Sequence, residues 1–480
     1  MKNKKKFKLI FLVISIFLIN NNLYSQTYSI NETGTNLYEI ENKSSSGLYI
    51  SVKNDSLTLS KKENVDLKWR KTNLPDGYFY LDFVSGKNDN KRLLATSYLG
   101  ARLTKTGIEG KNDDVRWRMQ PANGEDWFYL EHKTSGRYLS KQDNKLVLVE
   151  KKNLSDKSMW KLNLKKIDLT SIQSPIIMMG NDKTGFRDPA VVYHEGIFYM
   201  YYSLVTTEED ENIYWHVAYS KSEDLVSWTD PVIITPKDQN KNFGSPGNVI
   251  RFNDEWVLCM QTYVIPGYNR KDKLRFGNKD CRIWITRSKD LENWSEPEML
   301  QVKGKGIDPG KMIDAYLVED KDEKGKWWCF YKQNGASYSY SYDLKNWTYE
   351  GHTEAGENVC VWVEDDEYYM MHSPKMGVGI LKSKNLKNWI EVDKNNVLGQ
   401  EDWGHWAGQR VTAGFVIDLR NNPNIGKYLL FYHGQGPAPK TTEIINSGTD
   451  LGIAWSDDFI NWNWPGQNNK TKRKDEDAQK

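Results

Sequence analysis

The sequence predicts an all-β protein with two domains, an N-terminal β-trefoil followed by a five-bladed β-propeller. Two internal repeats of different kinds support this prediction. One carries the pattern S-x-[DN]-[LF]-x-x-W five times, and the other ends three times in a tryptophan-containing strand. A small unit of short strands cannot bury its faces alone, so such units occur in closed, repeated arrangements.

The fivefold repeat predicts the propeller over residues 171–467. Each copy of the pattern follows an aromatic, β-branched run of the kind seen at Phe198–Tyr202, which is typical of a strand. We expect the pattern itself to be a structural turn. Its five copies begin at Ser222, Ser288, Ser341, Ser383 and Ser456.

The threefold repeat occupies residues 26–165, and its units end in Trp69, Trp117 and Trp160. We expect these tryptophans to lie in the core of the domain. Three such units resemble the ricin-type β-trefoil, a lectin-like module, and the resemblance implies carbohydrate binding. The family ends each unit in Q-x-W, whereas this chain has LKW, VRW and SMW.

The two ends of the chain have their own signatures. Residues 1–25 combine five lysines with the apolar run Leu9–Ile19, which predicts a signal peptide and export to the periplasm or the extracellular space. Residues 468–480 are almost entirely polar, and we expect them to be disordered. Without the five lysines the chain has 61 basic and 64 acidic side chains, which argues against nucleic-acid or membrane partners. We expect a monomer.

The innermost strand of every propeller blade lies beside the central axis, so residues at its start face a common funnel. Alignment of the five blades on their aromatic strands puts Asp188, Ser245, Asp314, Glu357 and Arg410 at this position. Three carboxylates in one partly desolvated funnel disfavour one another's charge, so such a cluster points to a function. Glycoside hydrolysis fits, because it needs one carboxylate as base and another as acid.

The propeller resembles the family 43 glycoside hydrolases and their relatives in the superfamily that includes invertases and neoagarobiose hydrolases. The resemblance rests on Asp188 in the motif F-R-D-P, Asp314 before a hydrophobic strand, Glu357, and the sequence Y-H-G at Tyr432–Gly434. It implies that Asp188 is the base, Asp314 modulates a pKa, and Glu357 is the general acid of an inverting reaction.

Further residues are assigned to substrate binding, and no residue is assigned as a metal ligand. No cofactor is expected to be required, and a central calcium ion is left open, because Gln409 and Arg410 stand where the family commonly has a histidine. The substrate would be a plant or algal polysaccharide or oligosaccharide. A non-catalytic carbohydrate-binding propeller and a glycoside phosphorylase or transglycosylase are the alternatives. The predicted substrate-binding residues are Arg187, Ser245, His405, Arg410 and His433.

Overall fold

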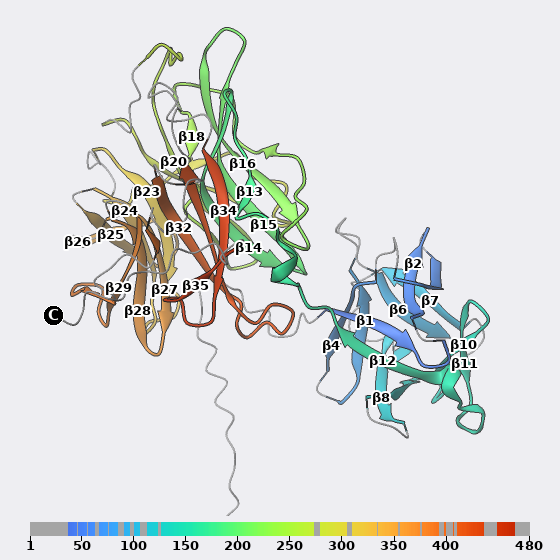
Figure 1. Cartoon of the computed structure of the whole chain (residues 1–480). Helices are drawn as coiled ribbons and strands as arrows, with labels where there is room; N and C mark the ends of the chain where they lie inside the picture. Colours follow the sequence, from blue (N-terminus) through green and yellow to red (C-terminus); the bar gives the residue numbers. More distant parts are fainter. Residues whose placement is uncertain are drawn as a thin grey trace, which may run out of the picture.

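The computed structural model contains two bodies of β-structure, which Figure 1 shows side by side and joined by a narrow segment. Among the described residues, no helix is long and apolar enough to cross a membrane. The predicted signal peptide and C-terminal tail lie outside the described residues. The structure describes residues 37–45, 47–54, 56–62, 67–74, 76–84, 91–96, 100–105, 113–122, 126–272, 279–304, 310–333, 335–353, 356–374, 377–392, 398–399, 407, 410–435 and 449–465.

The N-terminal domain is one twelve-stranded antiparallel sheet with short 3-10 helices. The strands are β1 (Leu37–Asn42), β2 (Tyr49–Lys53), β3 (Ser56–Ser60), β4 (Trp69–Asn73), β5 (Phe79–Phe83), β6 (Lys91–Thr96), β7 (Gly100–Lys105), β8 (Trp117–Pro121), β9 (Phe128–His132), β10 (Tyr138–Gln142), β11 (Lys145–Val149) and β12 (Met159–Leu164). The 3-10 helices among the described residues are η1 (Asp113–Val115), η2 (Lys151–Asn153), η3 (Asp156–Ser158) and η4 (Leu169–Ser171).

The three tryptophans of this domain repeat one interaction. Trp69, Trp117 and Trp160 are completely buried, as expected, and pack in one core. Their indole N–H groups donate to the carbonyl oxygens of Ile50, Leu93 and Leu139 at 2.9, 3.1 and 2.9 Å. Because a buried indole needs an acceptor, each unit fixes its tryptophan on its own second strand. The sequence units are therefore structural repeats.

The second body is a five-bladed propeller, and each blade is one sheet. Blade one holds β14 (Thr184–His194), β15 (Ile197–Thr207), β16 (Ile213–Ser222) and β17 (Val232–Ile233). Blade two holds β18 (Phe243–Gly244), β19 (Val249–Phe252), β20 (Glu255–Thr262), β21 (Ile283–Ser288) and β22 (Glu298–Met299). Blade three holds β23 (Ile313–Glu319), β24 (Trp327–Lys332), β25 (Ala336–Ser341) and β26 (Thr348–Thr353). Blade four holds β27 (Glu357–Glu364), β28 (Glu367–Ser373), β29 (Gly377–Ser383), β30 (Ile390–Glu391) and β31 (Leu398–Gly399).

Blade five combines both ends of the propeller. It contains β32 (Arg410–Asp418), β33 (Tyr428–Gln435), β34 (Asp450–Ser456), β35 (Trp462–Asn463) and the early strand β13 (Ile176–Met178). Ile176 of β13 pairs with Gly452 of β34. This pairing closes the ring.

The repeated tryptophan pattern forms turns, as expected. In the first copy, Asp224 Oδ1 accepts the backbone N–H groups of Val226 and Ser227 at 2.9 and 2.7 Å. The residue after the aspartate has a positive φ, which costs free energy for a residue other than glycine, and the hydrogen bonds offset that cost. The same conformation occurs at Leu225, Leu291, Leu344, Leu386 and Phe459.

The two domains contact each other directly. Arg70 Nη1 lies 2.5 Å from Glu195 Oε1, and buried Lys68 lies 2.5 Å from Glu223 Oε1. Asn424 of blade five accepts the backbone N–H of Leu37 at 3.3 Å and donates to the Leu37 carbonyl at 3.2 Å. Asn424 therefore supports the first strand of the neighbouring domain.

Candidate active site

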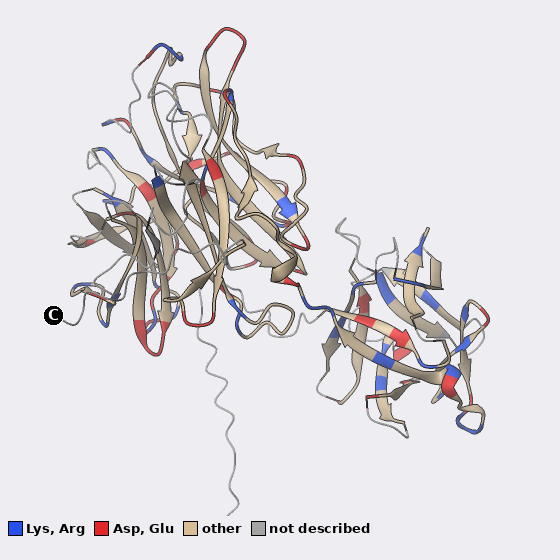
Figure 2. Ribbon diagram, viewed as in Figure 1, with Lys and Arg blue, Asp and Glu red and all other residues tan. Residues whose placement is uncertain are grey.

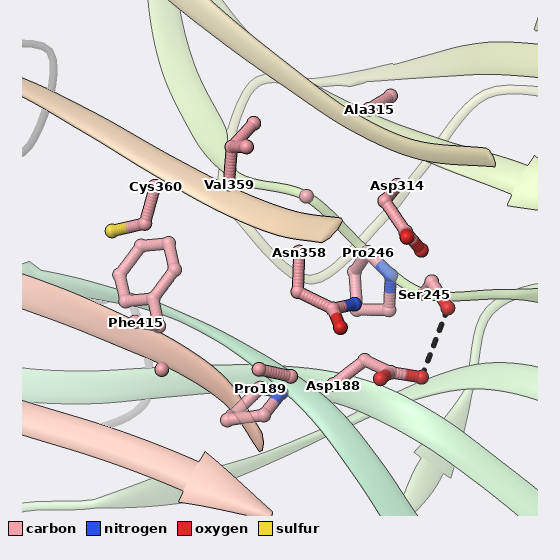
Figure 3. Close-up of a pocket in the computed structure, with 13 residues that line it drawn as sticks. Asp188, Pro189, Ser245, Pro246, Asp314, Ala315, Asn358, Val359, Cys360 and Phe415 are labelled. Carbon is pink, nitrogen blue, oxygen red and sulfur yellow. Dashed lines mark hydrogen bonds between the residues drawn. The ribbon is translucent and has the colours of Figure 1, made fainter. Parts of the chain in front are cut away.

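A small cavity lies where the five inner strands meet the propeller axis. Figure 3 shows Asp188, Ser245, Asp314 and Asn358 gathered on one side, with Pro189, Val359, Cys360 and Phe415 completing the wall. Its volume is about 30 Å³, which is enough for one or two water molecules. At the wall, Gly247 approaches the Ala315 carbonyl so closely that a Cβ atom would lie 1.6 Å from the oxygen. The two blades can meet here only without a side chain.

One backbone feature recurs at the cavity in every blade. The regular pairing of the inner strands in blades one, three, four and five shifts here, as in a β-bulge, and in blade two β18 ends here. Each blade has one residue with positive φ at this point, and its side chain is thereby redirected. These bulge residues are Asp188, Ser245, Asp314, Asn358 and Ala413, with φ of 51°, 41°, 58°, 54° and 52°.

The predicted alignment therefore holds in three blades and is wrong in two. Asp188, Ser245 and Asp314, which the alignment put at one position, are all bulge residues. In blade four the bulge residue is Asn358, so Glu357 lies one position earlier, equivalent to Arg187 in blade one. In blade five the bulge residue is Ala413, three residues after Arg410. Residue type did not reveal this shift, because Asn358 and Ala413 share only the backbone conformation of the two aspartates.

The middle strands supply acceptors for the N–H groups of the bulge residues. His433 Nδ1 accepts from Asp188 at 3.1 Å, and Ser203 Oγ accepts from Ser245 at 2.6 Å. Gln261 Oε1 accepts from Asp314. Ser373 Oγ accepts from Ala413 at 2.9 Å. In each case the acceptor belongs to the preceding blade, so these bonds join neighbouring blades.

Blade three departs from this acceptor ring. Its equivalent residue is Lys332, which pairs with Ile313 as Ser373 pairs with Glu357. The lysine ammonium group has no atom that can accept a hydrogen bond, so Lys332 cannot bind the N–H of the next bulge residue. The N–H of Asn358 donates instead to the Asp314 carboxylate, and the Lys332 ammonium contacts Glu357 Oε2.

Asp188 is a buried carboxylate held by hydroxyl groups. Ser203 Oγ and Ser245 Oγ donate to its Oδ2 at 3.0 and 2.9 Å. Burial raises the pKa of Asp188, but the neighbouring His433 ring, the charge of Arg187 and the hydrogen bond from Ser245 together hold it well below the ordinary value. Asp188 is ionised at neutral pH.

His433 is neutral in this site. Burial lowers the pKa of His433 to about 4, and its Nδ1 accepts the N–H of Asp188. Nδ1 cannot then also donate to the carboxylate. At neutral pH the stabilisation of ionised Asp188 therefore comes from the two serines and Arg187.

Asp314 has the opposite electrostatic environment. Burial and the negative charge of Asp188 raise the pKa of Asp314 to about 6, although Lys332, the N–H of Asn358 and Arg187 oppose the shift. Two carboxyl groups at one cavity thus have pKa values on opposite sides of the ordinary aspartate value. This separation is typical of acid–base sites.

The predicted binding residues divide into a buried group and an accessible group. Ser245, Arg187 and His433 are buried, and Ser245 and His433 hold Asp188 and its backbone. Arg410 and Glu357 are each 30% exposed, and Arg410 Nη2 lies 3.9 Å from Glu357 Oε1. Burial and the charge of Arg187 lower the pKa of Arg410 to about 10. His405 lies outside the described residues.

Sequence reasoning missed Lys332, Asn358 and Gln261. A signal for Lys332 was present: it ends the strand W-W-C-F-Y-K at the position where the other blades carry Ser203, Gln261, Ser373 and His433. Lys332 is recognised as the one lysine among these five equivalent positions only after the blades are aligned by their strand pairing.

The cavity offers few ligands for a calcium ion, which takes six to eight oxygens. Among the described residues, no three His, Cys, Asp or Glu side chains are placed to share a metal ion. Asp188 and Asp314 are the carboxylates of the lining. The donors do not fit calcium, and no chemical step is assigned to one.

Comparison with known proteins leaves the family open. No family model matches the sequence, and no curated protein matches it. Solved structures with a similar fold include an exo-1,5-α-L-arabinanase from a bovine ruminal metagenomic library, with 15% identity, 57% of this chain and 95% of that chain covered, and a TM-score of 0.41. The catalytic domain of a family 62 α-L-arabinofuranosidase from Coprinopsis cinerea has 16% identity, with 58% of this chain and 94% of that chain covered and a TM-score of 0.42. A family 117 glycoside hydrolase from Zobellia galactanivorans has 15% identity, with 57% of this chain and 85% of that chain covered and a TM-score of 0.42. At these values the matches assign neither a reaction nor a substrate to this chain.

Proposed function

We propose that this chain is an exported glycoside hydrolase of the five-bladed propeller type, related to family 43, which cleaves a plant or algal polysaccharide or oligosaccharide with inversion. The observation that carries the proposal is the pair Asp188 and Asp314. Both are buried at one cavity, one with a lowered and one with a raised pKa. A site that separates two carboxyl pKa values in this way is suited to proton transfer.

In the proposed reaction, ionised Asp188 takes a proton from water as the water oxygen attacks the anomeric carbon. The glycosidic bond breaks, and Glu357 gives a proton to the leaving oxygen. Asp314 lies between the two in sequence and in the ring, and its charge changes near pH 6. We therefore assign Asp314 to the tuning of proton transfer.

Glu357 must be released from its partners before it can act as an acid. It is paired with Lys332 and lies 3.9 Å from Arg410. A carboxylate between two cations has no proton to give. Its exposure lets a substrate reach it and displace Lys332. Glu357, no longer paired, then takes up a proton from solvent, and this is the proton that it gives to the leaving oxygen.

The experiment is a screen of purified protein on arabinosides, xylosides, galactosides and algal oligosaccharides. Products are followed by NMR, which shows the anomer formed first. We expect hydrolysis with inverted configuration, and a kcat lowered by a factor of roughly 10² to 10⁴ in Asp188→Asn. Retention of configuration would contradict the assigned mechanism, since a direct attack by water inverts the anomeric carbon.

The alternative is a carbohydrate-binding propeller without hydrolysis. The ion pairs of Glu357 favour it, because they occupy the group assigned as acid. Binding of oligosaccharides without any turnover, unchanged in Asp188→Asn, would support this alternative.

We further propose that the N-terminal domain is a ricin-type β-trefoil that binds carbohydrate. The support is its threefold repetition: three buried tryptophans, each bonded to the second strand of its own unit. Binding of the isolated domain to insoluble polysaccharides would test the assignment.

A further inference from the structure

The charged groups of the funnel form two layers. Asp188, Asp314 and Arg187 are buried. Lys332, Arg410 and Glu357 are accessible, with side-chain exposures of 38%, 30% and 30%. A ligand that enters the funnel therefore meets two cations and one carboxylate before it reaches the buried aspartates.

The propeller fold does not require a positively charged side chain at the position of Lys332. Every other blade has an acceptor there, and that acceptor binds the N–H of the next bulge residue. A serine or glutamine would serve the fold equally well. Lys332 instead places a charge within reach of Glu357, which points to a role outside the fold.

Positive charge is concentrated around this position. Burial lowers the pKa of Lys332, and the charges of Lys311 and Arg410 lower it further, against the opposing charge of Asp314. The charge of Arg187 acts on Arg410 in the same way. Elsewhere, acidic and basic residues are scattered over both domains, as Figure 2 shows. The accessible part of the funnel therefore holds two cations, Lys332 and Arg410, against the single carboxylate Glu357 on a nearly neutral protein.

We propose that Lys332 and Arg410 form a subsite for an anionic group on the sugar, either the carboxylate of a uronic acid or a sulfate ester. The inference rests on the proposed function and names its substrate class. Arginine and lysine side chains bind carboxylate and sulfate oxygens through charge-assisted hydrogen bonds. The incoming anion takes the place of Glu357 between the two cations, and Glu357 is then released beside the glycosidic bond.

The position of the cations favours a substituent of the sugar over free phosphate. Lys332 and Arg410 flank Glu357, the group assigned to the leaving oxygen. A phosphate that replaced water as nucleophile would have to lie on the side of Asp188, which is buried. Both accessible cations thus pair with Glu357, and Arg410 also lies close enough to Arg187 and Asp188 for their charges to act on it.

The test compares matched oligosaccharides that differ only in one residue: neutral galactose, galacturonate, or galactose 6-sulfate, and the same set for glucose. Both kcat/KM and binding by calorimetry are measured on the full chain at low and high salt. We expect at least a tenfold preference for acidic members, which decreases as salt increases. Lys332→Met and Arg410→Met should abolish the preference. The control Lys289→Met removes a lysine from an exposed turn of blade two and should keep it.

Each result decides the proposal. A preference for uronates or for sulfates identifies the source of the anion. The subsite is rejected if neutral and acidic oligosaccharides have equal kcat/KM. It is also rejected if the preference for acidic oligosaccharides remains in both Lys332→Met and Arg410→Met. Cleavage that requires inorganic phosphate also overturns it and favours a phosphorylase. If nothing is cleaved, the proposed hydrolase fails, while Lys332-dependent binding of acidic sugars would still support the subsite and its absence would reject it.

Discussion

Asp188 and Asp314 share one buried cavity, and their environments move their pKa values in opposite directions. Two serine hydroxyls stabilise the charge of Asp188. Asp314, in contrast, is buried beside that charge and has a pKa of about 6. The two side chains occupy equivalent bulge positions in blades one and three, so their difference comes from their partners and not from the backbone.

Replacement of Asp188 tests the base. We expect Asp188→Asn to lower kcat by a factor of roughly 10² to 10⁴, the usual contribution of a general base. Activated aryl glycosides and natural substrates should be affected equally, since both need an activated water. Glu357→Gln should mainly slow substrates with poor leaving groups. If both variants showed the same dependence on the leaving group, the two roles would be wrongly assigned.

The raised pKa of Asp314 predicts how the free energy of unfolding depends on pH. Its folded pKa of about 6 is above the ordinary 3.8, so its contribution to stability is complete below pH 3.8 and is lost as pH increases through 6. Asp314→Asn removes this loss. The free energy of unfolding of the variant relative to wild type should therefore increase between pH 4 and pH 7.5, by an amount on the order of 3 kcal/mol. Urea denaturation at both pH values measures it, and a change of opposite sign would reject the raised pKa.

The acceptor ring predicts a contrast between two substitutions. Gln261→Leu leaves the buried N–H of Asp314 without its acceptor and should cost about 1–3 kcal/mol of unfolding free energy. Lys332→Gln introduces the acceptor type found in blade two and loses only a partly exposed ion pair, so it should remain within about 1 kcal/mol of wild type. Chemical denaturation of both variants decides this. Equal losses would show that Lys332 serves the fold after all.

The border between the domains predicts where the propeller can be cut. Leu169 is buried in the propeller core, Ile167 packs against it, and the N–H of Ile167 donates to the Asn424 carbonyl at 2.8 Å. A chain that starts at Lys166 should therefore fold and keep activity on small soluble substrates. A chain that starts at Ser171, the predicted domain border, lacks both residues and should melt at a lower temperature. Identical melting curves would show that these residues do not stabilise the propeller.

The sequence was sufficient where a local pattern determines the structure. The turns after Ser222 and its four equivalents follow from side chains that bond their own backbone, and the buried tryptophans follow from the threefold repeat. The site was only partly predictable. The bulge is defined by backbone conformation, which Asn358 and Ala413 adopt without any shared chemistry. Lys332 is recognised as different only by comparison with the hydrogen-bond acceptors that occupy the equivalent position in the other four blades.

The closing pair β13 and β34 sets the order of events during synthesis. Gly180, just after β13, donates to Asp450 of β34 at 2.8 Å, across 270 residues of chain. At about 5–20 residues per second, a ribosome needs roughly 15 to 50 seconds to make that stretch. The N-terminal domain is complete long before then. The first strand of the propeller must therefore wait, exposed and unpaired, until almost the whole protein has been made, and this interval is when the nascent chain most needs protection from aggregation.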